Sequence, residues 1–159
     1  MLKIISNVII FTFEGEIVEK MNYNYQNTIQ LRVRYGETDQ MGYCYYGNYA
    51  QYFEVGRVEA LRSLGMSYKS LEDNGIMLPV LDFSIHYNSP ALYDDLLSIT
   101  TKIVKIEGAK LFFTYSIHNE STQLICTATT TLVFINKENN KPFKAPLSFV
   151  QLLQNYSND

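Results

Sequence analysis

The chain has 159 residues, 47% of them hydrophobic, and a formal net charge of -3. This length is that of one ordinary domain with room for a substantial core. The acidic balance, with no long basic run, argues against nucleic acid or an anionic membrane as the main partner. The two cysteines, Cys44 and Cys126, show neither a CxxC pair nor a zinc-binding spacing, which favours a reducing compartment.

The N-terminal stretch LKIISNVIIFTF is apolar for fewer residues than the roughly 20 that a membrane span requires. The acidic run EGEIVEKM that follows has no small-residue cleavage site, so a secretory signal is not predicted either. We expect no membrane insertion, no export and a cytoplasmic location. Residues 1–21 are expected to be an N-terminal extension, either an added strand or a segment upstream of a true start at Met21, and residues 22–159 to form one domain.

The segment LRVRY at 31–35 alternates apolar and polar residues, as a half-buried strand does. Leu31, Val33 and Tyr35 would share one face, and the strand is expected to end at Gly36. After Asp39, the run QMGYCYYGN contains glycine and asparagine residues that are typical of a sharply bent loop.

Apolar residues recur at helical spacing from Tyr49 onward, which predicts a helix capped by Gly47 or Asn48 and ended by Gly65. Gly56 lies on the apolar stripe, although glycine costs roughly 1 kcal/mol of helix propensity relative to alanine. A close approach to another element, such as a sheet, would offset that cost. The charged residues fall largely elsewhere around the helix: Glu54, Arg57, Glu59 and Arg62.

A carboxylate just ahead of a helix N-terminus suggests a specific chemistry. Unpaired backbone N–H groups and the positive end of the helix dipole can stabilise a developing oxyanion. Asp39 would then attack an acyl carbonyl held there or activate water, which implies acyl-transfer hydrolysis. The sequence leaves both roles open, and a simple turn-forming or capping role for Asp39 is the alternative.

The ordered residues of this segment resemble the catalytic signature of the hotdog-fold acyl-CoA thioesterases, the 4-hydroxybenzoyl-CoA thioesterase-like family. The residues that carry the resemblance are Asp39, Gly42, Tyr46, Tyr49, Glu54 and Arg57. In SIHYNSPALYDDLLSITTKI, a second resemblance to the family's strand, turn and next strand rests on Tyr87, Pro90, Ala91, Asp94 and Asp95. The two signatures together cover most of residues 29–135. One departure is Tyr46, where many relatives have histidine and others tyrosine.

The resemblance implies an α+β hotdog fold, an antiparallel sheet of about five strands wrapped around one long central helix. It implies that Asp39 is the catalytic carboxylate and that the backbone around Tyr46 and Gly47 supplies the oxyanion donors. It also implies hydrolysis of an acyl-CoA substrate without a metal or an organic cofactor. The residues expected to bind substrate are Gly42, Tyr43, Tyr49, Glu54, Tyr87 and Pro90.

Alternatives remain for several of these residues. A surface ion pair between Glu54 and Arg57, worth about 0.2–0.5 kcal/mol, accounts for these two residues as well as a role in the signature does. In a related hotdog class the catalytic carboxylate lies on the central helix, so Glu54 and Glu59 stay minor candidates for that role. For four tyrosines of the loop and the first helical turns, packing is preferred over pocket lining: Tyr43, Tyr45, Tyr49 and Tyr52. Tyr46 is the exception.

A nucleophilic role is not favoured for Cys44, because no histidine in its segment could activate it. His86 and His118 lack metal-ligand spacing and are interpreted as strand residues. Two groups of lysines could hold the CoA phosphates: Lys137, Lys141 and Lys144 form one, and Lys102, Lys105 and Lys110 form the other. A solvated surface role is preferred for both groups.

The rest of the chain predicts a short helix ending at Gly75, four strands and a short terminal helix in FVQLLQNY. The strands are expected at 76–88, 95–107, 110–119 and 123–136. A single sheet leaves an unpaired edge, so a homodimer or homotetramer with shared active sites is expected. Two other functions stay open, a non-catalytic binding module for acyl-CoA or acyl carrier protein, and a hydratase or dehydratase. The absence of histidine from the Asp39 loop and the helix counts against the latter.

Overall fold

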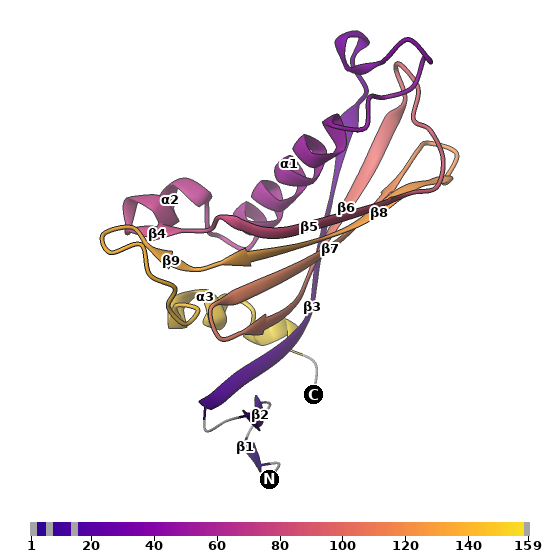
Figure 1. Cartoon of the computed structure of the whole chain (residues 1–159). Coiled ribbons are helices and arrows are strands. Elements are labelled where there is room, and N and C mark those ends of the chain that lie inside the picture. The colour runs from indigo at the N-terminus through magenta and orange to yellow at the C-terminus, as the bar shows by residue number, and fades with distance from the viewer. Residues whose placement is uncertain (1–2, 6–7, 14–15, 158–159) are drawn as a thin grey trace.

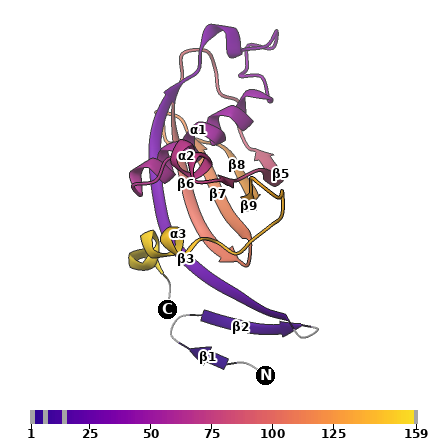
Figure 2. The same ribbon diagram turned by 90° about the vertical axis from the view of Figure 1, so that its left-hand side faces the viewer.

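The computed structural model describes residues 3–5, 8–13 and 16–157, with side chains from residue 20 onward. A long helix lies against one face of a curved antiparallel sheet (Figures 1 and 2). The strands are β1 (Lys3–Ile5), β2 (Val8–Phe13), β3 (Glu16–Arg32), β4 (Ile76–Met77), β5 (Val80–Tyr87), β6 (Leu96–Glu107), β7 (Lys110–His118), β8 (Leu124–Val133) and β9 (Ile135–Asn136). The helices are η1 (Tyr35–Glu37), α1 (Asn48–Ser63), α2 (Tyr68–Asp73), α3 (Leu147–Leu152) and η2 (Gln154–Tyr156).

The main sheet has the strand order β1-β2-β3-β6-β7-β8-β5, and each neighbouring pair is antiparallel. Five of these strands, β3, β6, β7, β8 and β5, form the sheet that carries α1, while β1 and β2 extend it beyond the N-terminal half of β3. This is the predicted α+β hotdog architecture, and the prediction is confirmed. No helix in the described part of the chain is both long enough and apolar enough to cross a bilayer.

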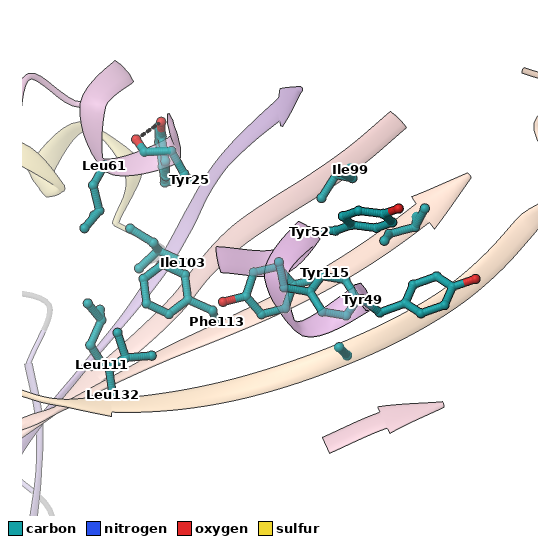
Figure 3. Close-up of a cluster of buried hydrophobic side chains, with 14 of the residues drawn as sticks. Tyr25, Tyr49, Tyr52, Leu61, Ile99, Ile103, Leu111, Phe113, Tyr115 and Leu132 are labelled. Carbon is teal, nitrogen blue, oxygen red and sulfur yellow. Dashed lines mark hydrogen bonds between the residues drawn. The ribbon is translucent and has the colours of Figure 1, made fainter. Parts of the chain in front are cut away.

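The core lies between α1 and the inward face of the sheet (Figure 3). Side chains on β6 and β7 alternate between buried and partly exposed, which is the period of a sheet with one covered face. Phe113 and Tyr115 of β7 are buried with ring centroids 6.1 Å apart, and Tyr115 contacts Phe53 of the helix at a centroid distance of 4.8 Å. Each large apolar side chain fully buried in this way contributes roughly 1.5–3 kcal/mol.

The helix α1 matches its prediction closely. Gly65 follows the helix with φ of +88°, a left-handed conformation that suits glycine. A Cβ atom on Gly56 would come 2.7 Å from Thr101 Oγ1 and 3.1 Å from Ile99 Cγ2, both on β6. The predicted close approach to a sheet is therefore confirmed, and it explains a glycine within a helix.

One sequence-based placement was wrong, and one alternative that the sequence left open is not observed. Tyr35 does not share a buried strand face, because β3 ends at Arg32 and the chain turns into η1. Tyr35 is 80% exposed, and its ring contacts that of Tyr93 at a centroid distance of 5.6 Å. Arg57 does not form a surface ion pair with Glu54, because its side chain is buried.

The buried Arg57 guanidinium donates from Nε to Tyr68 Oη at 2.8 Å and from Nη1 to Tyr115 Oη at 3.2 Å. The ion pair observed on the helix surface is instead that between Arg62 and Glu59. The hydroxyl groups of Tyr68 and Tyr115 thus replace water around the guanidinium. Helical periodicity does not predict these partners, because they lie outside α1.

The remaining predicted strands and helices are present with modest changes. The segment 76–88 is divided into β4 and β5 around Pro79, and β4 pairs with β9 rather than with the main sheet. Among the described residues before Met21, 3–5 and 8–13 are strands, and β3 runs from Glu16 without a break. Residues 1–2, 6–7 and 14–15 lie outside the described part, and the position at which the domain begins stays a prediction.

Candidate active site

A small hairpin places Asp39 between the end of β3 and the start of α1. The backbone N–H of Asp39 donates to Tyr43 O at 2.8 Å, and the N–H of Gly42 donates to Asp39 O at 3.0 Å. Gly42 has a φ of +79°, which only glycine adopts without a steric penalty. Thr38 and Cys44 pair as the next rung. The turn residues therefore fix the backbone from which the Asp39 carboxylate projects.

The half-buried Asp39 carboxylate uses only one of its oxygens to support this turn. Oδ1 accepts hydrogen bonds from Met41 N at 2.8 Å and from Tyr43 N at 3.4 Å. This is the turn-forming role that the sequence left open as an alternative. Oδ2 has no hydrogen-bond partner within residues 16–157, so the capping role leaves one oxygen available for chemistry.

The start of α1 supplies backbone donors next to this hairpin. Asn48 N–H donates to Tyr45 O at 3.0 Å, and Tyr49 N–H makes a long contact of 3.4 Å to Tyr46 O. The preceding N–H groups, those of Tyr46 and Gly47, have no acceptor in the described part of the chain. They lie at the positive end of a 16-residue helix, which is a favourable position for a negatively charged oxygen.

A pocket of about 330 Å³ brings the two sequence signatures together. Tyr87 of β5 donates from Oη to Tyr46 O at 3.2 Å, across 41 positions of sequence, and its ring contacts Tyr49 at 5.5 Å. The first segment contributes to the lining Asp39, Met41, Tyr43, Cys44, Tyr46 and Tyr49, and the second contributes Tyr87, Asn88, Ser89 and Pro90.

Six of the nine predicted site residues line this pocket: Asp39, Tyr43, Tyr46, Tyr49, Tyr87 and Pro90. Gly42 and Gly47 shape the backbone beside it, whereas Glu54 is exposed on α1 and outside the pocket lining. Tyr49 and Tyr52 are buried as packing residues, and the rings of Tyr43, Tyr45 and Tyr46 are exposed. The roles of the nine residues in catalysis and binding stay predictions.

A larger hollow of about 670 Å³ lies at the other end of β5, against the turn between β6 and β7. Its lining is mostly apolar, and the charged residues in it are Glu107 and Lys110. Glu107 is paired with Lys105, whose ammonium group also lies 4.0 Å from the centre of the Phe112 ring. Its one carboxylate is held in this ion pair, and no helix begins in its lining, so its size does not make it the better candidate.

The cysteines and histidines offer no competing centre. Burial raises the pKa of the Cys44 thiol and raises that of Cys126 to about 12, which disfavours the reactive thiolate of both. His86 is exposed on the edge strand, and His118 lies at the end of β7. The described residues contain no cluster of His, Cys, Asp and Glu side chains suited to a metal ion.

Glu37 is the residue near the site that sequence reasoning missed. It is only 7% exposed, and its carboxylate accepts four hydrogen bonds, from Arg34 N, Nε and Nη2 and from Tyr52 Oη. Burial acts to raise the pKa of Glu37, but the hydrogen bonds from Arg34 and Tyr52 outweigh it and lower that pKa. The spacing of Arg34 and Glu37 beside a turn was the available signal.

Known proteins resemble this chain in sequence and in fold. Residues 33–153 match the family model of the Thioesterase-like superfamily. The putative acyl-CoA thioesterase YneP of Bacillus subtilis is 36% identical over 120 residues, covering 76% of this chain and 87% of the relative. The acyl-CoA thioester hydrolase YbgC of Escherichia coli O6:H1 is 32% identical over 120 residues, covering 76% and 90%.

Among solved structures, a DHNA-CoA thioesterase from Staphylococcus aureus superposes with a TM-score of 0.74 and 33% sequence identity. The matched region covers 82% of this chain and 93% of that one. The family match extends from the end of β3 through α3, and so includes both segments that line the Asp39 pocket. The chain belongs to the Thioesterase-like superfamily of hotdog proteins.

Proposed function

We propose that this protein is an acyl-CoA thioesterase, which hydrolyses the thioester of an acyl-CoA to a free acid and CoA. The observation that carries the proposal is that Asp39 and Tyr46 line one pocket. Oδ2 of Asp39 has no hydrogen-bond partner in the described chain, and the N–H groups of Tyr46 and Gly47 have no acceptor there. Relatives named acyl-CoA thioesterase and acyl-CoA thioester hydrolase support the same reaction class.

In the proposed reaction, the thioester carbonyl oxygen accepts hydrogen bonds from the N–H groups of Tyr46 and Gly47. These donors stabilise the negative charge that develops on that oxygen, and removing one such donor in other enzymes costs about 10²–10³ in kcat. The fixed start of α1 holds both donors in place before substrate arrives, so little reorganisation is needed in the transition state.

Two roles for Asp39 fit this placement. As a nucleophile, it attacks the carbonyl carbon, the C–S bond breaks to release CoA thiolate, and water then hydrolyses the resulting anhydride. As a general base, it takes a proton from water, whose oxygen attacks the carbonyl before the thiolate leaves and is protonated. Both routes give the same products and require no metal or organic cofactor.

The aromatic walls of the pocket are proposed to hold the acyl group and the thioester. Tyr49 and Tyr87 contact each other on one side, and Tyr43 lies on the hairpin that carries Asp39. Gly42 and Pro90 would shape the entrance through their turns, and Glu54 is retained as a more distant binding candidate. Tyr46 would act mainly through its backbone, because the residue is 65% exposed.

The assembly is proposed to be a homodimer or a homotetramer. The edge strand β5 pairs only with β8 in the described chain and exposes Val80, Leu81 and Phe83. An exposed apolar edge of this kind is commonly covered by a second chain. Because Tyr87 and Pro90 lie at the end of this strand, its partner would approach the pocket. An acyl carrier protein as an alternative acyl donor and a cytoplasmic location also stay predictions.

The test is thiol release from a panel of short-chain, medium-chain, long-chain and aromatic acyl-CoAs by the purified protein. Release of CoA with formation of the free acid is expected for at least one class of acyl-CoA, and the class that is hydrolysed fastest identifies the substrate class. Tight binding across the panel without release would favour a non-catalytic module. Hydration of enoyl-CoA without thiol release would favour the hydratase or dehydratase alternative.

A further inference from the structure

Glu37 is the one buried carboxylate in the part of the chain whose side chains are described, and it lies two residues before Asp39. Its side chain links two elements. Oε1 accepts from Arg34 Nε at 2.7 Å, and Oε2 accepts from Tyr52 Oη at 2.6 Å and from Arg34 N at 2.8 Å. Arg34 follows β3 and Tyr52 belongs to α1, so the carboxylate fixes the exit of the strand against the helix.

The backbone of Glu37 extends the same connection. Its carbonyl oxygen accepts from Tyr45 N at 2.8 Å and from Asn48 Nδ2 at 2.7 Å. Tyr45 directly precedes the proposed oxyanion donors, and Asn48 is the first residue of α1. Glu37 therefore lies in the segment that carries the Asp39 carboxylate and is hydrogen-bonded to the segment that carries the backbone donors.

We infer that Glu37 is a positioning residue that sets the placement of the Asp39 carboxylate relative to the N–H groups of Tyr46 and Gly47. The inference rests on the proposed function, since it assigns Glu37 a role in that same site. Glu37 does not line the pocket and acts through Asp39 and the helix start. A misplacement of about 1 Å between reacting groups can cost on the order of 10²-fold in rate.

Substitution of Tyr52 is the most specific way to remove a hydrogen bond between Glu37 and α1. Its ring is 2% exposed, and its hydroxyl lies between Glu37 Oε2 and Cys44 Sγ, the latter at 3.5 Å. Tyr52→Phe removes the hydroxyl and keeps the ring in the core. Tyr25→Phe is a matched control, because Tyr25 Oη donates to Ala60 O at 2.8 Å near the opposite end of α1.

The experiment compares Tyr52→Phe, Glu37→Gln and Tyr25→Phe with the wild type in steady-state thioester hydrolysis. We expect Tyr52→Phe and Glu37→Gln to lower kcat by about 10- to 100-fold while KM stays within about threefold, because transition-state geometry rather than ground-state binding is lost. Tyr25→Phe should stay within about twofold of wild-type kcat despite a similar loss of thermal stability.

If all three variants lost kcat only in proportion to their loss of folded protein, Glu37 would be a structural residue and the inference would be wrong. Asp39→Asn in the same assay separates this failure from that of the proposed function. Unchanged turnover in Asp39→Asn would refute the role of Asp39, whereas a dead Asp39→Asn beside a fully active Glu37→Gln and Tyr52→Phe would refute only the inference.

Hydrogen exchange provides a readout that does not depend on activity. In Tyr52→Phe, the amides of residues 38–47 should exchange faster than in the wild type, while those at the C-terminal end of α1 should not change. Tyr25→Phe should show the reverse pattern. Unchanged exchange over 38–47 in both Tyr52→Phe and Glu37→Gln would overturn the inference even if no substrate had been identified.

Discussion

Two carboxylates lie two residues apart in very different surroundings. Glu37 is buried and accepts four hydrogen bonds, whereas Asp39 lines a pocket and has one oxygen bonded to its own turn. A saturated carboxylate is suited to holding structure, and a carboxylate with an unpartnered oxygen is suited to chemistry. The structure thus separates the two acids by environment, which their spacing in the sequence does not reveal.

The lowered pKa of Glu37 predicts a pH-dependent contribution to stability. Because the folded-state pKa lies below the ordinary value of 4.5, the contribution is fully present above about pH 4.5 and is lost as pH falls through the folded-state pKa. We expect Glu37→Gln to lower the free energy of unfolding by about 1–3 kcal/mol at pH 7. The difference from wild type should shrink toward pH 3, as measured by urea unfolding.

Glu120→Gln is the matched control, since Glu120 is exposed in the turn after β7. Its unfolding free energy should stay close to that of the wild type at both pH values. A Glu37→Gln penalty that is equal at pH 7 and pH 3 would show that charge on Glu37 contributes nothing, and would assign the loss to packing alone.

At the scale of the element, α1 shows what a periodic pattern can establish. The apolar stripe, the glycine stop and the close contact at Gly56 follow from spacing and from the properties of glycine, and all three are present. The burial of Arg57 does not follow, because Tyr68 and Tyr115, which solvate it, are distant in sequence. Glu37 was missed for the same reason, since Tyr52 lies 15 residues away.

The contact between α1 and β6 predicts that Gly56→Ala destabilises the fold. The new methyl group would meet Thr101 Oγ1 at 2.7 Å, and overpacking of this kind typically costs about 1–3 kcal/mol. This exceeds the gain in helix propensity of up to about 1 kcal/mol. Gly36→Ala should be close to neutral, because a Cβ at Gly36 would meet no atom within 4 Å. Thermal unfolding of both variants provides the comparison.

A Gly56→Ala protein as stable as Gly36→Ala would contradict the close packing of α1 on the sheet.

The strand predictions had a different limit, since alternation gave the positions of β6, β7 and β8 but not that β5 pairs with β8. Strand order depends on long-range pairing that local pattern does not encode. Pro79 was the visible signal for the break that separates β4 from β5.

At the scale of the molecule, the two edges of the five-stranded sheet differ. The β3 edge is covered over its N-terminal half, because β2 pairs with its first residues and the C-terminal segment contacts it through Tyr23 with Ser157 and Tyr25 with Tyr156. The β5 edge has no such cover in the described chain and exposes apolar side chains. This asymmetry favours self-association through β5.

Leu81→Lys is therefore expected to weaken the oligomer, because a lysine on an edge strand opposes pairing with a second chain. Light scattering coupled to size exclusion should show a shift toward monomer at micromolar concentration. Leu147→Lys is the control, because Leu147 is 70% exposed on α3 and Leu81 is 60% exposed on β5. A Leu81→Lys protein with wild-type mass, or a monomeric wild type that hydrolyses thioesters, would exclude the proposed shared site.

The most direct measurement is the single-turnover rate of thioester hydrolysis by Asp39→Asn, with acyl-CoA binding measured separately. Asparagine keeps the shape and the Oδ1 acceptor of the turn, so folding and binding should persist. We predict a loss of at least ~10²-fold in rate, whereas Asp73→Asn, at an exposed position on α2, should match the wild type. Hydrolysis by Asp39→Asn at the wild-type rate would contradict the central claim that this carboxylate performs the chemistry.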